Sequence, residues 1–161
     1  MNTTCVEANK MLYVNPSIMD NNIIRNIIQL YRQKYEKTCD EKVGYIVSIN
    51  SIKKLENVIS RDSNHIQFCA LLEMSAIKPE KGLRFTFTPS LIIQKGIFGK
   101  IYDISILIPE DFLKSKGWTF HENSFVNGKN GQLTTSTAVD AMIMNYQFAG
   151  SKYNCICDIV S

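Results

Sequence analysis

The chain has 161 residues, of which 45% are hydrophobic and 20% are charged, and it carries a formal net charge of +3. This composition is typical of a folded globular chain and excludes a disordered tail, which would hold fewer apolar residues. So small a net charge excludes a bulk polyanion binder, and any contact with phosphate must come from a local cluster of cations.

The first predicted elements are a strand and a helix. Residues 10–14 read as a short strand that Asn15-Pro16 ends, because proline donates no hydrogen bond and the residue before it avoids the helical region. From Asn22 onward apolar residues recur at a spacing of three to four. This period predicts one amphipathic helix that ends near Glu36.

Two strands are predicted next, each with one buried face. Residues 43–52 and 66–76 alternate between apolar and polar side chains. The polar segment 53–64 between them is longer than a tight hairpin needs, so we expect it to project as a tip. The first half therefore predicts a helix laid on a small antiparallel sheet.

A domain boundary is predicted at Lys78-Pro79-Glu80-Lys81-Gly82, where proline and glycine stand in a polar stretch. It divides the chain into domains 1–79 and 80–161.

The second domain is predicted to consist of short strands. A helical turn is expected from Pro109 and a long loop or loose hairpin over 114–137. The strand-like segments are 83–88, 91–94, 97–102, 104–108, 139–148 and 153–160. Five short strands with a helical turn after the third are typical of a Greek-key barrel of the OB type. The predicted fold class is α+β: an N-terminal helix on a small antiparallel sheet, followed by a five-stranded OB-fold β-barrel.

No constellation for catalysis, a metal or a cofactor is visible in the sequence. Cys155 and Cys157 lack a second pair that would complete four zinc ligands, and on a strand they would face a barrel interior together. His65 and His121 have no nucleophile or acid placed near them in the sequence. Five cysteines without a repeated spacing, together with no secretory signal, indicate a reduced intracellular setting. The apolar runs are far shorter than the roughly 18 to 20 residues of a bilayer span, so we expect a soluble protein without membrane contact.

A basic and aromatic segment, residues 81–102, predicts contact with single-stranded RNA. It holds four cations and four aromatic residues and no acidic residue. Cations can hold phosphates while aromatic rings stack on bases. By alternation, Phe85 and Phe87 are expected to pack in the barrel core. The predicted RNA-binding residues are Arg84, Lys95, Phe98, Lys100 and Tyr102.

Three motifs in this order resemble one known family. They are Val14-Asn15-Pro16-Ser17, then Tyr35-Glu36-Lys37-Thr38-Cys39 with the strand 42–47, then the boundary 78–82. They are similar to the stalk subunits of multisubunit DNA-directed RNA polymerases, the seventh-subunit type of RNA polymerase II and its archaeal equivalent. The segment 53–64 lacks the glycine-rich run usual in that family, and residues 84–87 depart from its valine-glycine pattern. These departures bear on RNA contact more than on the fold.

The resemblance implies a non-catalytic subunit of an RNA polymerase. Its first domain would dock on the largest and second-largest core subunits near the clamp, and its barrel would contact nascent single-stranded RNA or transcription factors. Cellular members pair with a small helical stalk partner, and the sequence leaves open whether this chain does. The implied docking residues are Pro16, Ser17, Ile18, Met19, Leu55, Glu56, Asn57 and Val58.

The bias toward Asn, Ile and Lys resembles AT-rich genomes such as those of poxviruses and their relatives, which encode a polymerase with a small stalk-like subunit. A viral member would work in the host cytoplasm and be packaged in the virion, whereas a cellular member would be nuclear. Three other interpretations stay open from the residues themselves. They are a free-standing OB-fold RNA-binding protein, an enzyme with a site of scattered residues, and a structural subunit whose barrel has lost RNA contact.

Overall fold

The computed structural model describes residues 1–16, 23–59, 65–129 and 131–160. Its contacts divide the chain into two compact units, Asn2–Ile77 and Lys78–Ser161, which are described separately below. Within these ranges no helix is long and apolar enough to cross a membrane.

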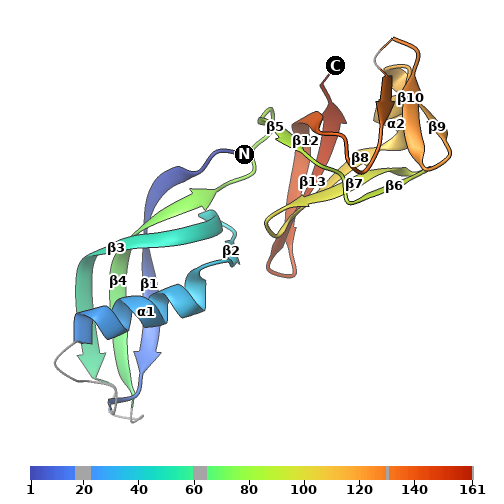
Figure 1. The fold of residues 1–161 in the computed structure, drawn as a ribbon. Coiled ribbons are helices and arrows are strands. Elements are labelled where there is room, and N and C mark those ends of the chain that lie inside the picture. Colours follow the sequence, from blue (N-terminus) through green and yellow to red (C-terminus); the bar gives the residue numbers. More distant parts are fainter. Residues whose placement is uncertain (17–22, 60–64, 130, 161) are drawn as a thin grey trace. The chain divides into compact units, whose positions relative to one another are not determined.

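The first unit is a four-stranded antiparallel sheet with one helix on one of its faces (Figure 1). The strand order is β1-β4-β3-β2, with β1 at Thr4–Val14, β2 at Cys39–Asp40, β3 at Gly44–Ile59 and β4 at Ile66–Ile77. Helix α1 covers Ile23–Tyr35, where the spacing of apolar residues predicts a helix.

The core of the first unit lies between α1 and the sheet. Ile27 and Tyr31 of α1 are fully buried against alternate residues of β1 and β4, such as Leu12 and Phe68. The Tyr31 hydroxyl lies 3.1 Å from the carbonyl oxygen of Lys10 and 3.3 Å from that of Phe68, to which it can donate. The helix therefore packs across both strands. Even-numbered residues of β1 and β4 face α1, and odd-numbered residues face the opposite side of the sheet.

The predicted tip at 53–64 is wrong for residues 53–59, which continue strand β3. The pairing of β3 with β4 shifts register at three points, between residues 46 and 48, 49 and 51, and 52 and 54. Each shift breaks the two-residue alternation that marks a strand in a sequence. Residues 60–64 lie outside the described residues.

A part-buried ion pair ties β1 to β2. Lys10 Nζ donates a hydrogen bond to Asp40 Oδ2, and the backbone N–H groups of Lys42 and Val43 donate to Asp40 Oδ1 over 2.8 and 2.9 Å. Burial by itself raises the pKa of the Asp40 carboxyl, but these hydrogen bonds outweigh burial and hold that pKa below its usual value. The carboxylate form of Asp40 therefore stabilises the first unit.

We expect Asp40→Asn to lower the free energy of unfolding of the first unit by about 1–2 kcal/mol, because the charge that accepts these bonds is removed. The usual pKa of an aspartate, about 4, applies to the unfolded chain, and the pKa in the folded chain is lower. The stabilisation by the Asp40 carboxylate is therefore complete above the usual pKa and is lost as the pH falls through the lowered one. Urea unfolding of the full chain, followed by far-UV circular dichroism, should therefore show a difference from wild type that is full at pH 7 and shrinks toward pH 3.

The matched control is Glu56→Gln, since the ion pair of Glu56 with Lys54 is exposed to solvent. A change within about 0.5 kcal/mol is expected there. Trp118 is the single tryptophan of the chain and belongs to the second unit, so its fluorescence should be unaltered in both variants. Equal losses in the two variants would contradict the role of Asp40.

The second unit is built on a six-stranded sheet in the order β5-β12-β13-β8-β7-β6. The strands are β5 at Arg84–Phe87, β6 at Leu91–Ile93, β7 at Gly96–Ile101, β8 at Ile104–Pro109, β12 at Val139–Ala149 and β13 at Lys152–Ile159. All pairings are antiparallel except that of β13 with β8, which is parallel. The described sheet holds six strands, one for each strand-like segment of the sequence and one more than the predicted five-stranded barrel, since residues 88–90 divide its first strand.

The segment 84–93 connects the two edges of this sheet. It contributes β5 to one edge and β6 to the other. Between them, the backbone N–H of Ser90 donates to the carbonyl of Phe98 over 2.9 Å. The ring of Phe87 on β5 lies so close to Gly99 on β7 that a Cβ there would be 2.6 Å from it. The edges of the sheet are thus brought together around one core.

The segment 114–137, predicted as a long loop or loose hairpin, contains a small antiparallel sheet made of two hairpins. Its order is β11-β10-β9, with β9 at Thr119–His121, β10 at Ser124–Asn127 and β11 at Gly131–Leu133. Helix α2, Glu110–Ser115, precedes it. Strands of three or four residues are too short to show an alternation in the sequence, and Phe125 and Leu133 are the buried side chains that hold them.

Candidate nucleic-acid interface

A groove on the outer side of the six-stranded sheet is the candidate site, and we call it the outer groove. It has a volume of about 520 Å³ and lies over β7, β8, β12 and β13. Ile97 and Gly99 of β7 are buried inside, so the alternate residues Phe98 and Lys100 face outward into the groove. Its lining consists of Ser90, Phe98, Gly99, Lys100, Ser105, Ile106, Leu107, Gln147, Asn154, Cys155 and Ile156.

An apolar row crosses the outer groove. Leu91, Phe98, Leu107 and Ile156 are successive cross-strand neighbours on β6, β7, β8 and β13. Leu91 is 51% exposed and Ile156 is 41% exposed, while Phe98 and Leu107 are half-buried between them. The ring of Phe98 therefore lies on a flat apolar floor that suits a stacked planar group.

A polar row runs beside the apolar row. Lys100, Ser105, Asn154 and Gln147 are successive cross-strand neighbours on β7, β8, β13 and β12. Within the described ranges, none of these four side chains makes a hydrogen bond to another part of the chain. One ammonium group, one hydroxyl and two carboxamides are thus available to a ligand.

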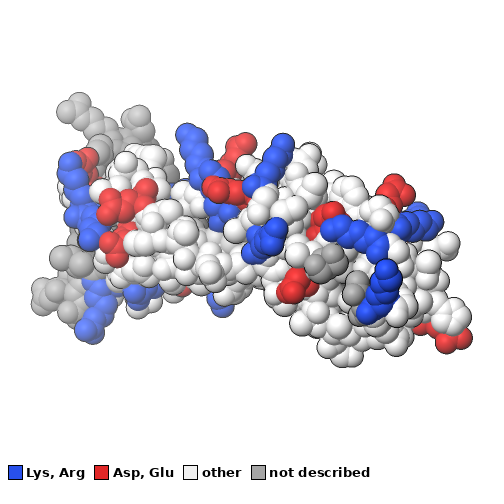
Figure 2. Space-filling view, turned by 90° about the horizontal axis from the view of Figure 1, so that it is seen from above, with Lys and Arg blue, Asp and Glu red and all other residues white. Residues whose placement is uncertain are grey.

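The charge in the outer groove is small but of one sign. Lys100 is the one charged side chain among the described lining residues. On the face of the molecule drawn in Figure 2, basic and acidic side chains are interspersed. A phosphate could thus be held by Lys100 locally, while attraction from a distance would be weak.

The thiols of Cys155 and Cys157 lie in the barrel interior, and Cys155 also contributes to the lining of the outer groove. Both are buried, and burial raises the pKa of each thiol to about 12. At neutral pH they are protonated, apolar side chains, as the prediction of two interior residues requires.

The structure brings only some of the predicted RNA-binding residues together. Phe98 and Lys100 share the outer groove. Lys95 and Tyr102 lie in the turns at opposite ends of β7, and both are exposed. These two residues flank the groove along the strand direction.

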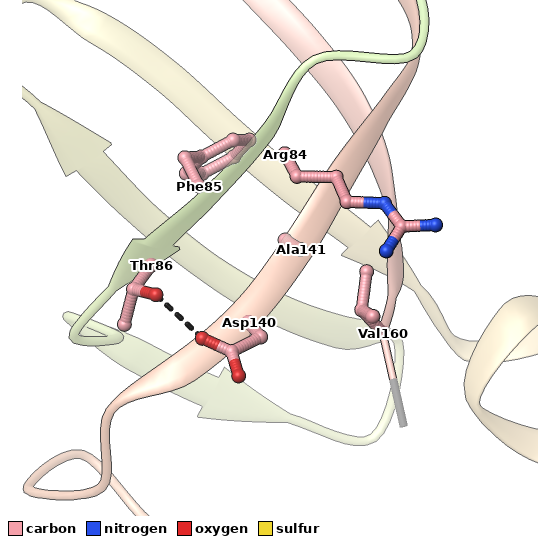
Figure 3. A pocket seen from close by; sticks show the side chains of 6 residues that line it. All are labelled: Arg84, Phe85, Thr86, Asp140, Ala141 and Val160. Atoms are coloured by element: carbon pink, nitrogen blue, oxygen red, sulfur yellow. Dashed lines mark hydrogen bonds between the residues drawn. The ribbon is translucent and has the colours of Figure 1, made fainter. Parts of the chain in front are cut away.

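Arg84 lies elsewhere, on β5. Figure 3 shows it in a separate pocket of about 290 Å³, where Thr86 donates a hydrogen bond of 2.5 Å to Asp140. Its cross-strand neighbours are Met142 and then Asp158. Arg84 therefore lies outside the outer groove that Phe98 and Lys100 line.

Five residues of the two rows that line the outer groove were missed by the sequence analysis: Ser105, Leu107, Gln147, Asn154 and Ile156. The strand pattern contained the signal for Leu107 and Ile156, since both are apolar residues at outward positions of predicted strands. The two amides carry no such signal. They join the site only because β13 pairs in parallel with β8.

The predicted docking residues gather in part at one end of the first sheet. Val14 and Ile59 both pair with Ile66, so the ends of β1 and β3 lie two strands apart there. Pro16, Glu56 and Asn57 are exposed at this end. Ser17, Ile18 and Met19 lie outside the described residues, as does the side chain of Val58.

Leu55, which was predicted as an exposed anchor, is partly buried. It packs against the core under α1, because it pairs with Ala70 on the helix-facing side of the sheet. Part of its apolar surface therefore contributes to the stability of the first unit.

The face of the sheet opposite α1 offers apolar residues that the sequence analysis did not select. Tyr13 is 59% exposed and Met11 is 41% exposed. Their cross-strand neighbours are Gln67 and Cys69. We call Met11, Tyr13, Gln67 and Cys69 the open sheet patch, and the signal for it was a run of four apolar residues, 11–14, which covers both faces of a strand.

Comparison with known proteins concerns the first unit. Residues 11–82 match the family model of the SHS2 domain found in the N terminus of Rpb7p/Rpc25p/MJ0397. No curated protein matches the chain. The family match confirms the resemblance that the sequence motifs indicated.

Proposed function

We propose that the whole chain is a non-catalytic stalk subunit of a DNA-dependent RNA polymerase. The observation that carries the proposal is the family match over residues 11–82, since the matched SHS2 domain is one found in the N terminus of Rpb7-type subunits. In this proposal residues 1–79 are the docking domain and residues 80–161 are the RNA-binding barrel.

The docking surface in this proposal is the end of the first sheet at which Val14 and Ile59 pair with Ile66. It combines the open sheet patch with the exposed Pro16, Glu56 and Asn57. Exposed apolar residues with a polar rim are typical of protein interfaces. The partner is the polymerase core near its clamp.

The barrel in this proposal is of the OB type. The order of its strands supports this, since the first strand, in two pieces, flanks both ends of the sheet and the third pairs in parallel with the last. OB folds bind ligands on the face of their second and third strands, which here are β7 and β8. The outer groove lies on that face, with Phe98 as a stacking ring and Lys100 as a phosphate contact.

The test is affinity purification of the tagged full chain from the cells that make it, after nuclease treatment, with mass spectrometry of the proteins that remain bound. We expect the two largest RNA polymerase subunits in near-equal molar amount to the chain. Nuclease treatment removes association through RNA alone. Recovery of the chain without these subunits would contradict the proposal and favour a free-standing RNA-binding protein.

A further inference from the structure

Among the described residues, the two carboxamides of the outer groove have no hydrogen-bond partner. Gln147 and Asn154 are directly opposite each other on β12 and β13, and both line the groove with Phe98. Within the described ranges neither side chain makes a hydrogen bond. Other amides of the chain do so: Asn50 donates to Ser75, and Gln132 donates to Ser124.

Contacts to the phosphate backbone of RNA would contribute little to the binding free energy at this site. Lys100 is the one cation among the described lining residues, and one phosphate contact corresponds to a salt slope of only about 0.7 for a single strand. Most of the binding must then come from stacking on Phe98 and from hydrogen bonds to base edges. Base contacts specify a sequence, whereas phosphate contacts do not.

We infer that the outer groove selects the base it binds, through hydrogen bonds from Gln147 and Asn154, and that it prefers adenine. This inference rests on the RNA contact proposed above. On the edge that carries N7, adenine presents an acceptor beside its amino donor, whereas guanine presents two acceptors and pyrimidines have no such ring nitrogen. Adenine therefore matches the one donor group and one acceptor of a carboxamide with a pair of bonds. Asn154 is the cross-strand neighbour of Ser105, and Gln147 is that of Asn154, so both amides line the β13 and β12 side of the same groove that Phe98 lines.

The experiment measures binding of the full chain to fluorescent eight-nucleotide RNAs by anisotropy. The probes are oligo(A), oligo(U), oligo(C) and an oligomer of purine riboside, which stacks like adenine but lacks the amino group. We expect oligo(A) to bind about tenfold more tightly than the purine riboside oligomer and the pyrimidine oligomers. Gln147→Ala/Asn154→Ala should remove the difference between oligo(A) and the purine riboside oligomer.

The remaining variants separate base selection from RNA binding as such. Lys95→Ala/Lys100→Ala should weaken all four probes and flatten their salt dependence, and Phe98→Ala should weaken all four, without changing their order. Gln29→Ala, which removes an exposed amide from α1, is the matched control and should change nothing. All groove substitutions are at outward positions, and Trp118 fluorescence checks that the barrel stays folded.

Equal binding of oligo(A) and the purine riboside oligomer by the wild-type chain would overturn the inference, as would a preference for a pyrimidine. A difference that persists in the double amide variant would overturn the assignment to Gln147 and Asn154. If the wild-type chain binds none of the probes, RNA contact itself is wrong. Co-purification with the polymerase would be unaffected by any of these results, so the two proposals fail separately.

Discussion

Replacing Met11 and Tyr13 together with aspartate is expected to release the chain from the polymerase. These two residues are the most exposed apolar side chains of the open sheet patch. If they fill pockets of the polymerase core, each should contribute about 2 kcal/mol to binding, so a charged replacement costs about 30-fold in affinity per residue. In the affinity purification, the double variant should recover less than about a tenth of the core subunits that the wild-type chain recovers.

The fold should tolerate this change, because both residues face away from the core under α1. Met144→Asp is the control, since it puts one such negative charge on an exposed methionine of the second unit. That variant should recover the core subunits as the wild-type chain does. Full recovery by the double variant would exclude the open sheet patch as the docking surface, while leaving the polymerase as the partner.

Gly99→Ala is expected to destabilise the second unit by about 2–3 kcal/mol. A Cβ at this position would lie 2.6 Å from the Cδ2 and Cε2 atoms of Phe87. Phe87 is only 4% exposed and packs against Phe85 with a ring-centroid distance of 5.8 Å, so its ring cannot move away without disturbing the barrel core. The clash falls where the two edges of the six-stranded sheet meet, and relief would require the edges to separate.

Urea unfolding followed by Trp118 fluorescence measures this effect, since Trp118 is buried in the second unit. Gly128→Ala is the control, because a Cβ there meets nothing within 4 Å. The double variant Gly99→Ala/Phe87→Leu should regain part of the loss, because the smaller side chain leaves room for the new methyl group. A stability of Gly99→Ala within about 0.5 kcal/mol of wild type would show that the contact between β5 and β7 does not hold the barrel closed.

Several elements were predictable because their sequence period is regular. The period of 3.6 residues predicted α1, and the strict alternation of β4 predicted that strand almost to its ends. The strands β1 and β3 were predicted too short for different reasons. The first half of β1 is an exposed edge strand with few apolar residues, and β3 is interrupted by three register shifts.

The candidate site was predictable only in part. Phe98 and Lys100 were selected because cations and aromatic residues are interleaved along 81–102, which is a property of the chain itself. Arg84 was selected on the same ground, and the fold places it in another pocket beside Asp140. The order of cations and aromatic residues along the chain shows which side chains are available. It does not show which of them lie on the same face of a closed sheet.

The sequence by itself determined the helix, the positions of most strands, the boundary near residue 78 and the family resemblance of the first unit. All of these depend on local periods or on the order of motifs, which neighbouring residues encode. Only the tertiary structure decided that the outer groove exists. It forms because the parallel pairing of β13 with β8 sets Asn154 beside Ser105, and Ile156 beside Leu107, across almost fifty residues of chain. Pairing between distant strands depends on how the whole core packs, and no local period records it.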